Sequence, residues 1–274
     1  MSTLENINPQ ILQKIQSLRL MDDDFMTVVF AEDSRATEFL LRIILHRDDL
    51  KVIRSMTQKE KRNLFGRSVK LDILAEDENK KLYNIEIQRS DKGADARRVR
   101  YNIAMLDSHT LKKNDDYSKL PELYIIFITE NDYLGLGKPI YEVSKQFIVK
   151  EKYNYLYLPF EDGCNIMYVN GEYRGNDAIG KLMHDFSIAN ADEMFYEEIA
   201  KRVRFHKQEE QGVRTMCRII EEYGEEKKAE GKLEGILEGK LKSQKETAKK
   251  LLEDGRYTIK EIAKLLNIPE KEIS

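Results

Sequence analysis

Asp72, Glu86 and Gln88 are the side chains whose types and spacing could do chemistry. They lie in two short runs, VKLDILAED and LYNIEIQ, in which apolar and polar residues alternate. A period of two predicts half-buried strands. The polar break between the runs, DENK, is rich in turn-forming residues and predicts a β-hairpin.

The register of this hairpin decides whether the two acids meet. A turn that places Glu76 opposite Leu82 brings Asp72 directly opposite Glu86. Like charges that face each other destabilise a sheet, so this arrangement indicates a bound divalent cation, for which carboxylate oxygens are suitable ligands. The spacing alone leaves a second interpretation open, in which the acids tolerate each other on a solvent face or the register differs by two residues.

The composition sets the broad class of the protein. Its 274 residues, 41% of them hydrophobic, suffice for one sizeable core and an appended module. Charged residues make up 35% of the chain but the net charge is only -3, so any surface for nucleic acid must be local. The two cysteines, Cys164 and Cys217, predict neither a disulfide framework nor a cysteine-rich zinc site.

The hydrophobic pattern shows neither an apolar leader segment nor a run long enough to span a membrane. We therefore expect a soluble, cytoplasmic protein that does not engage a membrane.

The elements around the hairpin predict an α/β fold. In order, they are helical stripes within 22–45, a strand at 51–56, the hairpin, a helix within 91–113 and a strand at 122–129. The last strand, ELYIIFIT, is continuously apolar, as is typical of a strand buried on both faces in a parallel position. The order predicts a mixed sheet flanked by helices. Further edge strands are expected at 145–149 and 155–158, and a short strand at 166–169 precedes a hairpin-type turn at Asn170-Gly171.

Three arginines, Arg97, Arg98 and Arg100, begin the predicted helix after the hairpin. The planar guanidinium fork binds two oxygens at once, which suits phosphate groups. The pattern leaves open the alternative that these are surface arginines paired with neighbouring aspartates.

The C-terminal part of the chain is charged and helical in pattern from residue 213 to 254. Gly231, Gly235 and Gly239 interrupt it, and each glycine costs about 1 kcal/mol relative to alanine in a helix. We expect a flexible, partly helical linker with a capacity for self-association. Thr258 and Glu261 form a capping box at the start of TIKEIAKLLNIPEKEI, which resembles the opening of a helix-turn-helix.

Several ordered blocks resemble the PD-(D/E)XK nuclease family transposases, relatives of the recombination-promoting Rpn nucleases. The blocks are MDDDFM, GRSVKLDILAED, YNIEIQRS, ARRVRY, LPELYIIFITEND and GKLMHDF, and together they span about residues 20–225. The resemblance implies a restriction-endonuclease-like core of order α-β-β-β-α-β with a helical C-terminal extension. We accordingly predict an N-terminal arm at 1–20, a nuclease-like domain at 21–224, and a charged helical tail with a small helix-turn-helix-like end at 225–274.

The resemblance also implies Mg²⁺-dependent cleavage of DNA, with Mn²⁺ as an alternative ion, in a transposition or recombination setting. Asp72 matches the metal-binding aspartate of the family, Glu86 its second acid, and Gln88 the residue two positions beyond. In the wider superfamily that last position is usually lysine, so the glutamine puts catalysis in doubt. We expect Asp72 and Glu86 to bind the metal and Gln88 to orient the attacking water.

The remaining expected roles concern DNA. Lys70 shares a face with Asp72 and could supply the missing positive charge, while Arg97, Arg98 and Arg100 would contact backbone phosphates. Two rival functions stay open: a catalytically silent DNA-binding protein on a nuclease fold, and an interaction protein that forms homo-oligomers through its helical tail or its core.

Overall fold

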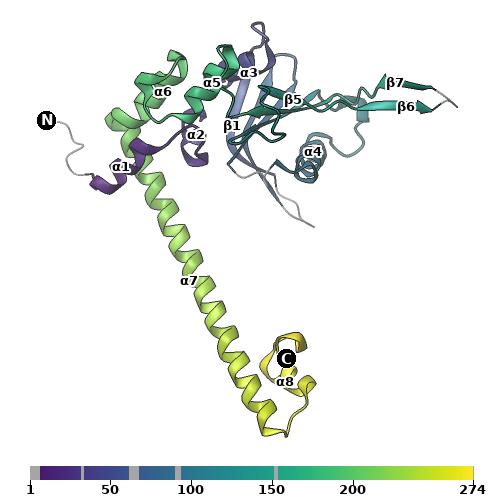
Figure 1. The fold of residues 1–274 in the computed structure, drawn as a ribbon, viewed down its shortest axis with the longest axis vertical. Coiled ribbons are helices and arrows are strands. Elements are labelled where there is room, and N and C mark those ends of the chain that lie inside the picture. The colour runs from purple at the N-terminus through teal and green to yellow at the C-terminus, as the bar shows by residue number, and fades with distance from the viewer. Residues whose placement is uncertain (1–6, 32–33, 62–67, 90–93, 151–153, 274) are drawn as a thin grey trace. The chain divides into compact units, whose positions relative to one another are not determined.

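The computed structural model of the chain describes residues 7–31, 34–61, 68–89, 94–150 and 154–273 (Figure 1). These residues form two compact units, Met1–Cys217 and Arg218–Ser274, which are described separately below. The predicted domain boundaries after residues 20 and 224 stay predictions.

A six-stranded mixed sheet is the centre of the first unit, and its strand order is β1-β2-β3-β4-β8-β5. The strands are β1 (Val52–Lys61), β2 (Val69–Asp77), β3 (Leu82–Gln88), β4 (Leu123–Thr129), β5 (Ile140–Glu142) and β8 (Cys164–Asn170). The first three pair antiparallel, β3, β4 and β8 run parallel, and β5 pairs antiparallel with β8. β4 is buried along almost its whole length in the middle of the sheet, which confirms the prediction from its continuous apolar run.

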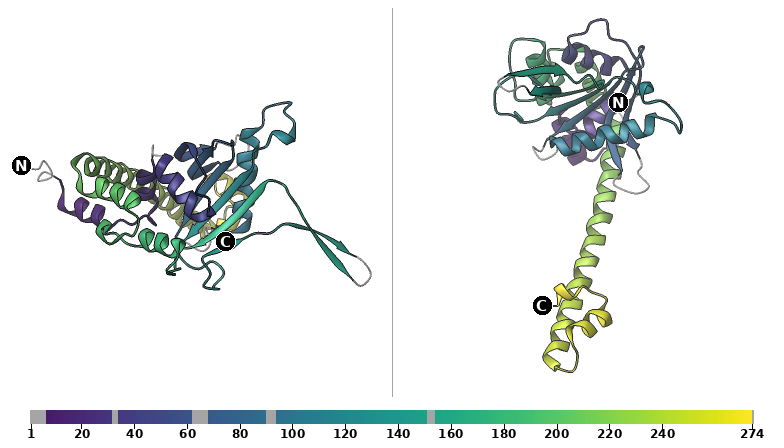
Figure 2. Two further views of the ribbon diagram at one scale, coloured as in Figure 1. Left: turned by 90° about the horizontal axis from the view of Figure 1, so that it is seen from above. Right: turned by 90° about the vertical axis from the view of Figure 1, so that its right-hand side faces the viewer.

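Helices cover both faces of this sheet (Figures 1 and 2). The helices of the first unit are α1 (Pro9–Ser17), α2 (Asp23–Phe30), α3 (Ser34–Leu45), α4 (Ala96–Thr110), α5 (Ala178–Ser187) and α6 (Glu197–Gln208), with 3₁₀ turns at Tyr117–Lys119 and Ala191–Glu193. α7 (Glu210–Asp254) begins in this unit and continues into the second, which also contains α8 (Ile259–Leu266) and a 3₁₀ turn at Glu270–Glu272. On one face, Val99 and Leu106 of α4 pack against Ile125 and Phe127 of β4. α2 and α3 contact β1 and β2, while α5 and α6 pack against α3. The order α3-β1-β2-β3-α4-β4 confirms the predicted α-β-β-β-α-β core.

Two local predictions beyond β4 were wrong, the placement of two expected edge strands and a hairpin turn. The segments at 145–149 and 155–158 are strands, but they pair only with each other, as β6 (Gln146–Lys150) and β7 (Tyr155–Pro159), in a separate sheet. The edge strand next to β8 is β5, which is too short to give a periodic pattern. Asn170-Gly171 does not turn into a hairpin, because the chain passes from β8 towards α5. Gly171 allows the close approach that this path needs, since an added Cβ would lie 2.3 Å from the carbonyl oxygen of Thr129 at the end of β4.

A buried lysine fixes the N-terminal segment of the first unit. The ammonium group of Lys207, in α6, donates to the carbonyl oxygens of Gln16 (3.0 Å), Leu18 (2.5 Å) and Ala189 (2.6 Å). It also lies 5.1 Å from the ring centre of Phe25. Burial lowers the pKa of Lys207 to about 8. Three carbonyl acceptors compensate for taking this charge out of water.

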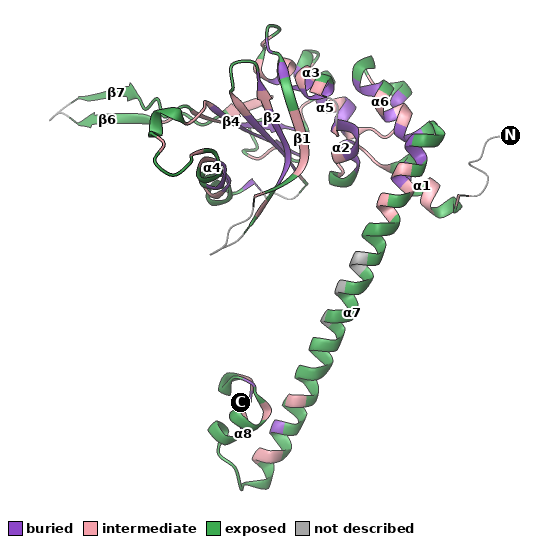
Figure 3. Ribbon diagram, turned by 180° about the vertical axis from the view of Figure 1, so that it is seen from behind, coloured by how far each residue is buried: buried purple, intermediate pink, exposed green. Residues whose placement is uncertain are grey.

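The second unit contains most of α7, which is exposed along most of its length (Figure 3). The predicted partly helical linker is one continuous helix in the structure, because glutamate and lysine favour helix strongly around the glycines. Ala248, Ile262, Ile268 and Ile273 form a small core where the end of α7 meets α8. The capping box of Thr258 and Glu261 is confirmed, and α8 is followed by a 3₁₀ turn at Glu270–Glu272.

Candidate active site

The β2–β3 hairpin has the predicted register. Glu76 lies opposite Leu82, and the pairing continues to Ile73 opposite Ile85. The next residue along each strand is one of the two predicted acids, so the backbone pairing ends where the candidate site begins.

Asp72 and Glu86 are both buried at this point. Asp72 is 8% exposed and Glu86 is 0% exposed. Burial, followed by the charges of Glu86 and Asp23, raises the pKa of Asp72 to about 8. Burial also raises the pKa of Glu86 above its usual range. Two acids that lose water and repel each other would gain from a nearby cation.

Hydrogen bonds fix the orientation of both carboxylates. The backbone N–H of Ile87 donates to Oδ2 of Asp72 at 2.9 Å. The amide of Asn84 donates to Oε1 of Glu86 at 2.9 Å, and the guanidinium of Arg98 donates to Oε2 at 3.3 Å. Each oxygen of Glu86 therefore accepts from a side-chain donor. Asn84 was missed by the sequence analysis, and its only signal was its position two residues before Glu86 on the same face of the strand.

Among the described residues, Arg98 is a positive charge in direct contact with the predicted catalytic pair. Besides Glu86 it contacts Gln88, whose side-chain oxygen accepts from Nη1 of Arg98 at 3.1 Å. The arginine side chain is 43% exposed, so one side of it faces solvent. Arg98 thus bridges Glu86 and Gln88, in the place where Lys70 was expected to act.

A cationic cavity of about 680 Å³ adjoins these residues, between the start of β2 and α4. Its lining comprises Ser68, Val69, Lys70, Arg97, Arg98, Tyr101 and Asn102. The structure therefore brings Lys70, Arg97 and Arg98 together at one cavity, and their predicted contacts with DNA stay predictions. Arg100 does not line this cavity, because two residues along a helix turn a side chain by about 200° from Arg98.

Asp23, near the start of α2, is a third acid that acts on this site. Its charge raises the pKa of both Asp72 and Glu86. Burial, and then the charge of Asp24, raises the pKa of Asp23 itself. No pattern in the sequence indicates this role, since aspartates before a helix are equally expected as caps.

Within the part of the chain that the structure describes, no group of three or more His, Cys, Asp or Glu side chains is arranged to hold a metal ion. Among the described residues, the carboxylates of Asp72 and Glu86 are the candidate donors. This donor set fits Mg²⁺, which commonly takes one or two carboxylates together with waters and substrate phosphates.

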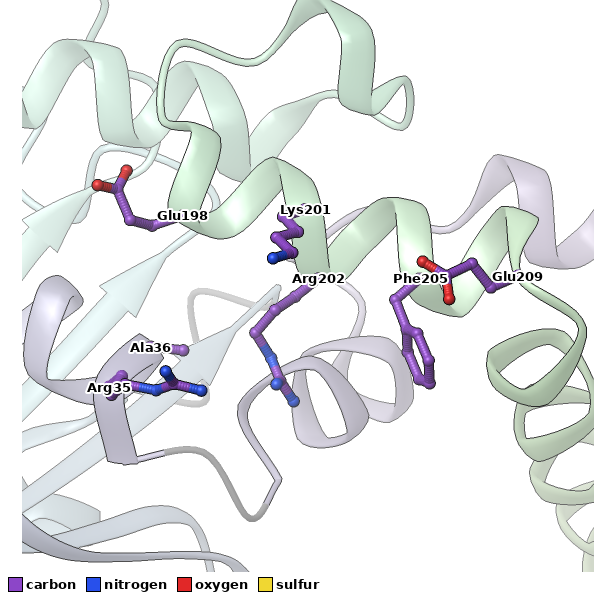
Figure 4. Close-up of a pocket in the computed structure, with 7 residues that line it drawn as sticks. All are labelled: Arg35, Ala36, Glu198, Lys201, Arg202, Phe205 and Glu209. Carbon is purple, nitrogen blue, oxygen red and sulfur yellow. The ribbon is translucent and has the colours of Figure 1, made fainter.

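A second cavity, of about 410 Å³, lies between α3 and α6 (Figure 4). It is lined by Arg35, Ala36, Glu198, Lys201, Arg202, Phe205 and Glu209. Arg202 is committed to the backbone of the protein, since its guanidinium donates to the carbonyl oxygens of Val29 and Ala31. The side chains that line this second cavity carry charges of both signs, and they include neither Asp72 nor Glu86. The second cavity therefore has no part in the chemistry proposed below.

The part of the chain that carries these residues matches a known family. A family model described as PD-(D/E)XK nuclease family transposase matches residues 32–172, more than half of the chain. The chain belongs to this family. The match contains Asp72, Glu86, Gln88 and the arginines of α4, whereas Asp23 lies outside it. Searches of curated proteins and of solved structures found no match.

Membership in the PD-(D/E)XK nuclease family transposases gives the chain a nuclease- and transposase-associated function. The mixed sheet flanked by helices agrees with the nuclease fold of this family. Its nucleases generally use divalent metals, and DNA is the implied substrate. Among the described residues, no helix combines the length and the apolar character that crossing a membrane requires.

Proposed function

We propose that the protein is a metal-dependent DNA endonuclease that hydrolyses phosphodiester bonds in transposition or recombination. The observation that carries this proposal is the buried pair of Asp72 and Glu86, which adjoins the cationic cavity. A surface pair of acids would not show the raised pKa values that burial gives this pair.

Asp72 and Glu86 would hold Mg²⁺ or Mn²⁺ through their carboxylate oxygens. A bound divalent cation lowers the pKa of a water ligand and offsets the charge that develops on the phosphate. The hydrogen bonds from Ile87 to Asp72 and from Asn84 to Glu86 keep one oxygen of each carboxylate in a fixed place. Preorganised ligands of this kind lose little entropy when the ion arrives.

The other residues of the site would act on water and phosphate. Gln88 cannot accept a proton near neutral pH, so its part is to orient the attacking water by hydrogen bonds. Arg98 and Arg97 would neutralise phosphates together with Lys70, since all three line the same cavity. Contacts of this kind position the backbone and carry no direct sequence information. Arg100, which lies on the same helix outside this cavity, would contact a more distant phosphate.

One observation favours the rival function of a silent DNA-binding protein. Arg98 satisfies an oxygen of Glu86 and the side-chain oxygen of Gln88 at the same time. A cationic side chain that stays on Glu86 would compete with a metal ion. Metal-dependent cleavage separates the two functions.

The test is plasmid nicking by the purified full-length protein with Mg²⁺ or Mn²⁺, compared with EDTA. Asp72→Ala and Glu86→Ala should each lower the nicking rate by more than about 100-fold, because even the hydrogen-bond partners of metal ligands are worth about 10- to 100-fold. Glu76→Ala is the matched control, since Glu76 lies on the same strand and pairs with Arg54 at 2.6 Å.

Full activity of Asp72→Ala would refute the assigned site. Absence of cleavage by any form, together with salt-sensitive binding to DNA, would establish the silent binder instead. Folding of each variant is checked by its thermal transition, so loss of structure is not mistaken for loss of chemistry.

A further inference from the structure

The β6–β7 ribbon, made of Gln146–Lys150 and Tyr155–Pro159, projects from the edge of the sheet formed by β5 and β8 (Figures 1 and 2). All ten residues of its two strands are exposed (Figure 3). Most of them are nevertheless aromatic or aliphatic, as in QFIVK and YLYLP. A large apolar surface in solvent marks an interaction site.

The register of the ribbon separates its two faces. Phe147 lies opposite Leu158, and Val149 lies opposite Leu156. Residues that face each other across an antiparallel pair share a face with their second neighbours, so these four side chains form one surface. Phe160 extends it, since its ring packs edge-on against Phe147 with 5.1 Å between the ring centres. We call Phe147, Val149, Leu156, Leu158 and Phe160 the ribbon apolar face.

The opposite face of the ribbon has a different composition. Ile148 and Tyr157 pair across it, as do Lys150 and Tyr155. The only charged residue in the two strands, Lys150, therefore lies on this opposite face. The ribbon is amphipathic, although neither face is covered.

A ribbon of this size needs a partner. An isolated two-stranded hairpin is at best marginally stable in water, and further strands or packing on a hydrophobic face are needed to support it. The side chains of the ribbon apolar face are 40–54% exposed. About half of this apolar surface is thus still open to water, and burying it under another surface would stabilise the ribbon further.

We propose that the ribbon apolar face binds the same face of a second copy of this chain, forming a two-fold symmetric dimer. The face has no charge and no hydrogen-bonding side chain, so a complementary surface must also be apolar. A second ribbon apolar face meets this requirement, and an isologous contact lets each residue serve both copies. Nucleic acid fits poorly, because binding its phosphates requires cations and this face carries none.

The area of the face sets the strength of the dimer. Half of a large side chain is roughly 100 Å², so five side chains bury about 400–500 Å² per copy and about 900 Å² in total. Stable interfaces bury about 1,200–2,000 Å². The dimer is therefore weak and depends on protein concentration, with an expected dissociation constant of about 10–100 μM. This inference does not rest on the proposed nuclease activity.

Sedimentation equilibrium of the full-length protein without DNA or metal, from about 1 to 300 μM, tests the proposal. The wild-type mass should rise with concentration from the chain mass of 32.2 kDa towards twice that value. Leu156→Glu should raise the dissociation constant by at least about 10-fold, because it places an unpaired charge in the contact. Tyr157→Glu is the matched control: Leu156 and Tyr157 are 54% and 58% exposed on adjacent positions of one strand, but they face opposite ways. This control should change the dissociation constant by less than about threefold.

Leu237→Glu, at a 57% exposed position of α7, controls for assembly through the tail and should leave the dimer intact. Because all three substituted residues are exposed, each variant should keep the wild-type thermal transition.

A wild-type protein that stays monomeric over the whole range overturns the proposal. So does a dimer that Leu156→Glu leaves unchanged, or one that only Leu237→Glu disrupts. Flotation with phosphatidylcholine vesicles and binding to duplex DNA are measured in parallel. If Leu156→Glu weakens one of these while the wild type remains monomeric, the ribbon has another partner and the proposal is wrong.

Discussion

Replacing Asp72 by asparagine should stabilise the metal-free protein at alkaline pH. The pKa of Asp72 is about 8 in the folded protein, against 3.8 for an ordinary aspartate. Between these pH values the folded protein keeps a proton that the unfolded chain releases, so wild-type stability falls as the pH rises towards 8. Asparagine removes this dependence because it carries no charge at any pH.

The size of the expected change in stability follows from the shift in the pKa of Asp72. Each pKa unit corresponds to about 1.4 kcal/mol, so a shift of about four units sets an upper limit of about 5–6 kcal/mol. Asparagine keeps an acceptor for the N–H of Ile87, which is 2.9 Å from Asp72, but exchanging a charged acceptor for a neutral one costs about 1 kcal/mol. We expect Asp72→Asn to raise the free energy of unfolding by about 2–4 kcal/mol at pH 9 and to leave it within about 1 kcal/mol of wild type at pH 4.

Urea unfolding in EDTA at pH 4, 7 and 9 measures this difference. Glu76→Gln, on the same strand, removes an acid that pairs with an exposed arginine and should change stability by less than about 1 kcal/mol at each pH. Adding Mg²⁺ at pH 8 should raise the thermal midpoint of the wild type but not that of Asp72→Asn, because only the wild type keeps both ligands. A stability difference that does not change with pH would refute the reasoning, as would a variant that is less stable than wild type at pH 9.

Three further outcomes are expected. Arg98→Ala should lower the single-turnover cleavage rate about 10- to 100-fold and reduce the slope of log affinity for DNA against log salt concentration by about one. Arg100→Ala should keep the cleavage rate within about threefold of wild type. Equal effects of the two variants would count against the cavity as the phosphate site. Asn84→Leu should lower cleavage about 10- to 100-fold, because Glu86 loses a donor, with less than a twofold change in DNA affinity; unchanged cleavage would contradict a positioning role. Lys207→Met should lower the free energy of unfolding by about 3 kcal/mol, because three carbonyl oxygens lose the donor that Lys207 supplies, and a loss below about 1 kcal/mol in urea unfolding would argue against that contact.

The hairpin could be predicted from the sequence because its information is local. Alternation with a period of two predicted the strands, and the polar turn allowed the register with Glu76 opposite Leu82, which the structure shows in place of one shifted by two residues. The acids Asp72 and Glu86 then follow as neighbours without any knowledge of the rest of the fold. The roles of these residues stay proposals until cleavage is measured.

Other parts of the site depend on packing that a local pattern does not contain. Asp23 acts on the carboxylates only because α2 packs against β1 and β2, which no spacing in the sequence reveals. The rotation of α4 about its axis decides that Arg98 rather than Arg100 lines the cavity. Lys70 was predicted to supply positive charge opposite Gln88. The side chain that contacts Gln88 is instead that of Arg98, ten residues after Gln88 in the sequence.

The ribbon shows a different limit of sequence analysis. The segments at 145–149 and 155–158 were predicted to be strands, and they are. Their apolar composition suggested a place in the sheet, whereas the structure pairs them with each other and leaves both faces in solvent. An alternating pattern indicates that a segment can form a strand, but the packing of the whole chain determines which strand it pairs with.

The lysine that fixes the N-terminal segment constrains the order in which the protein can be completed. Lys207 binds carbonyl groups 191 and 189 residues earlier in the chain, at Gln16 and Leu18. During synthesis, which proceeds from the N-terminus, these carbonyls leave the ribosome long before their donor exists. Contacts of such sequence separation form late and slow folding. The N-terminal segment therefore remains undocked on the nascent chain until α6 has emerged, and the first segment made is among the last to be fixed.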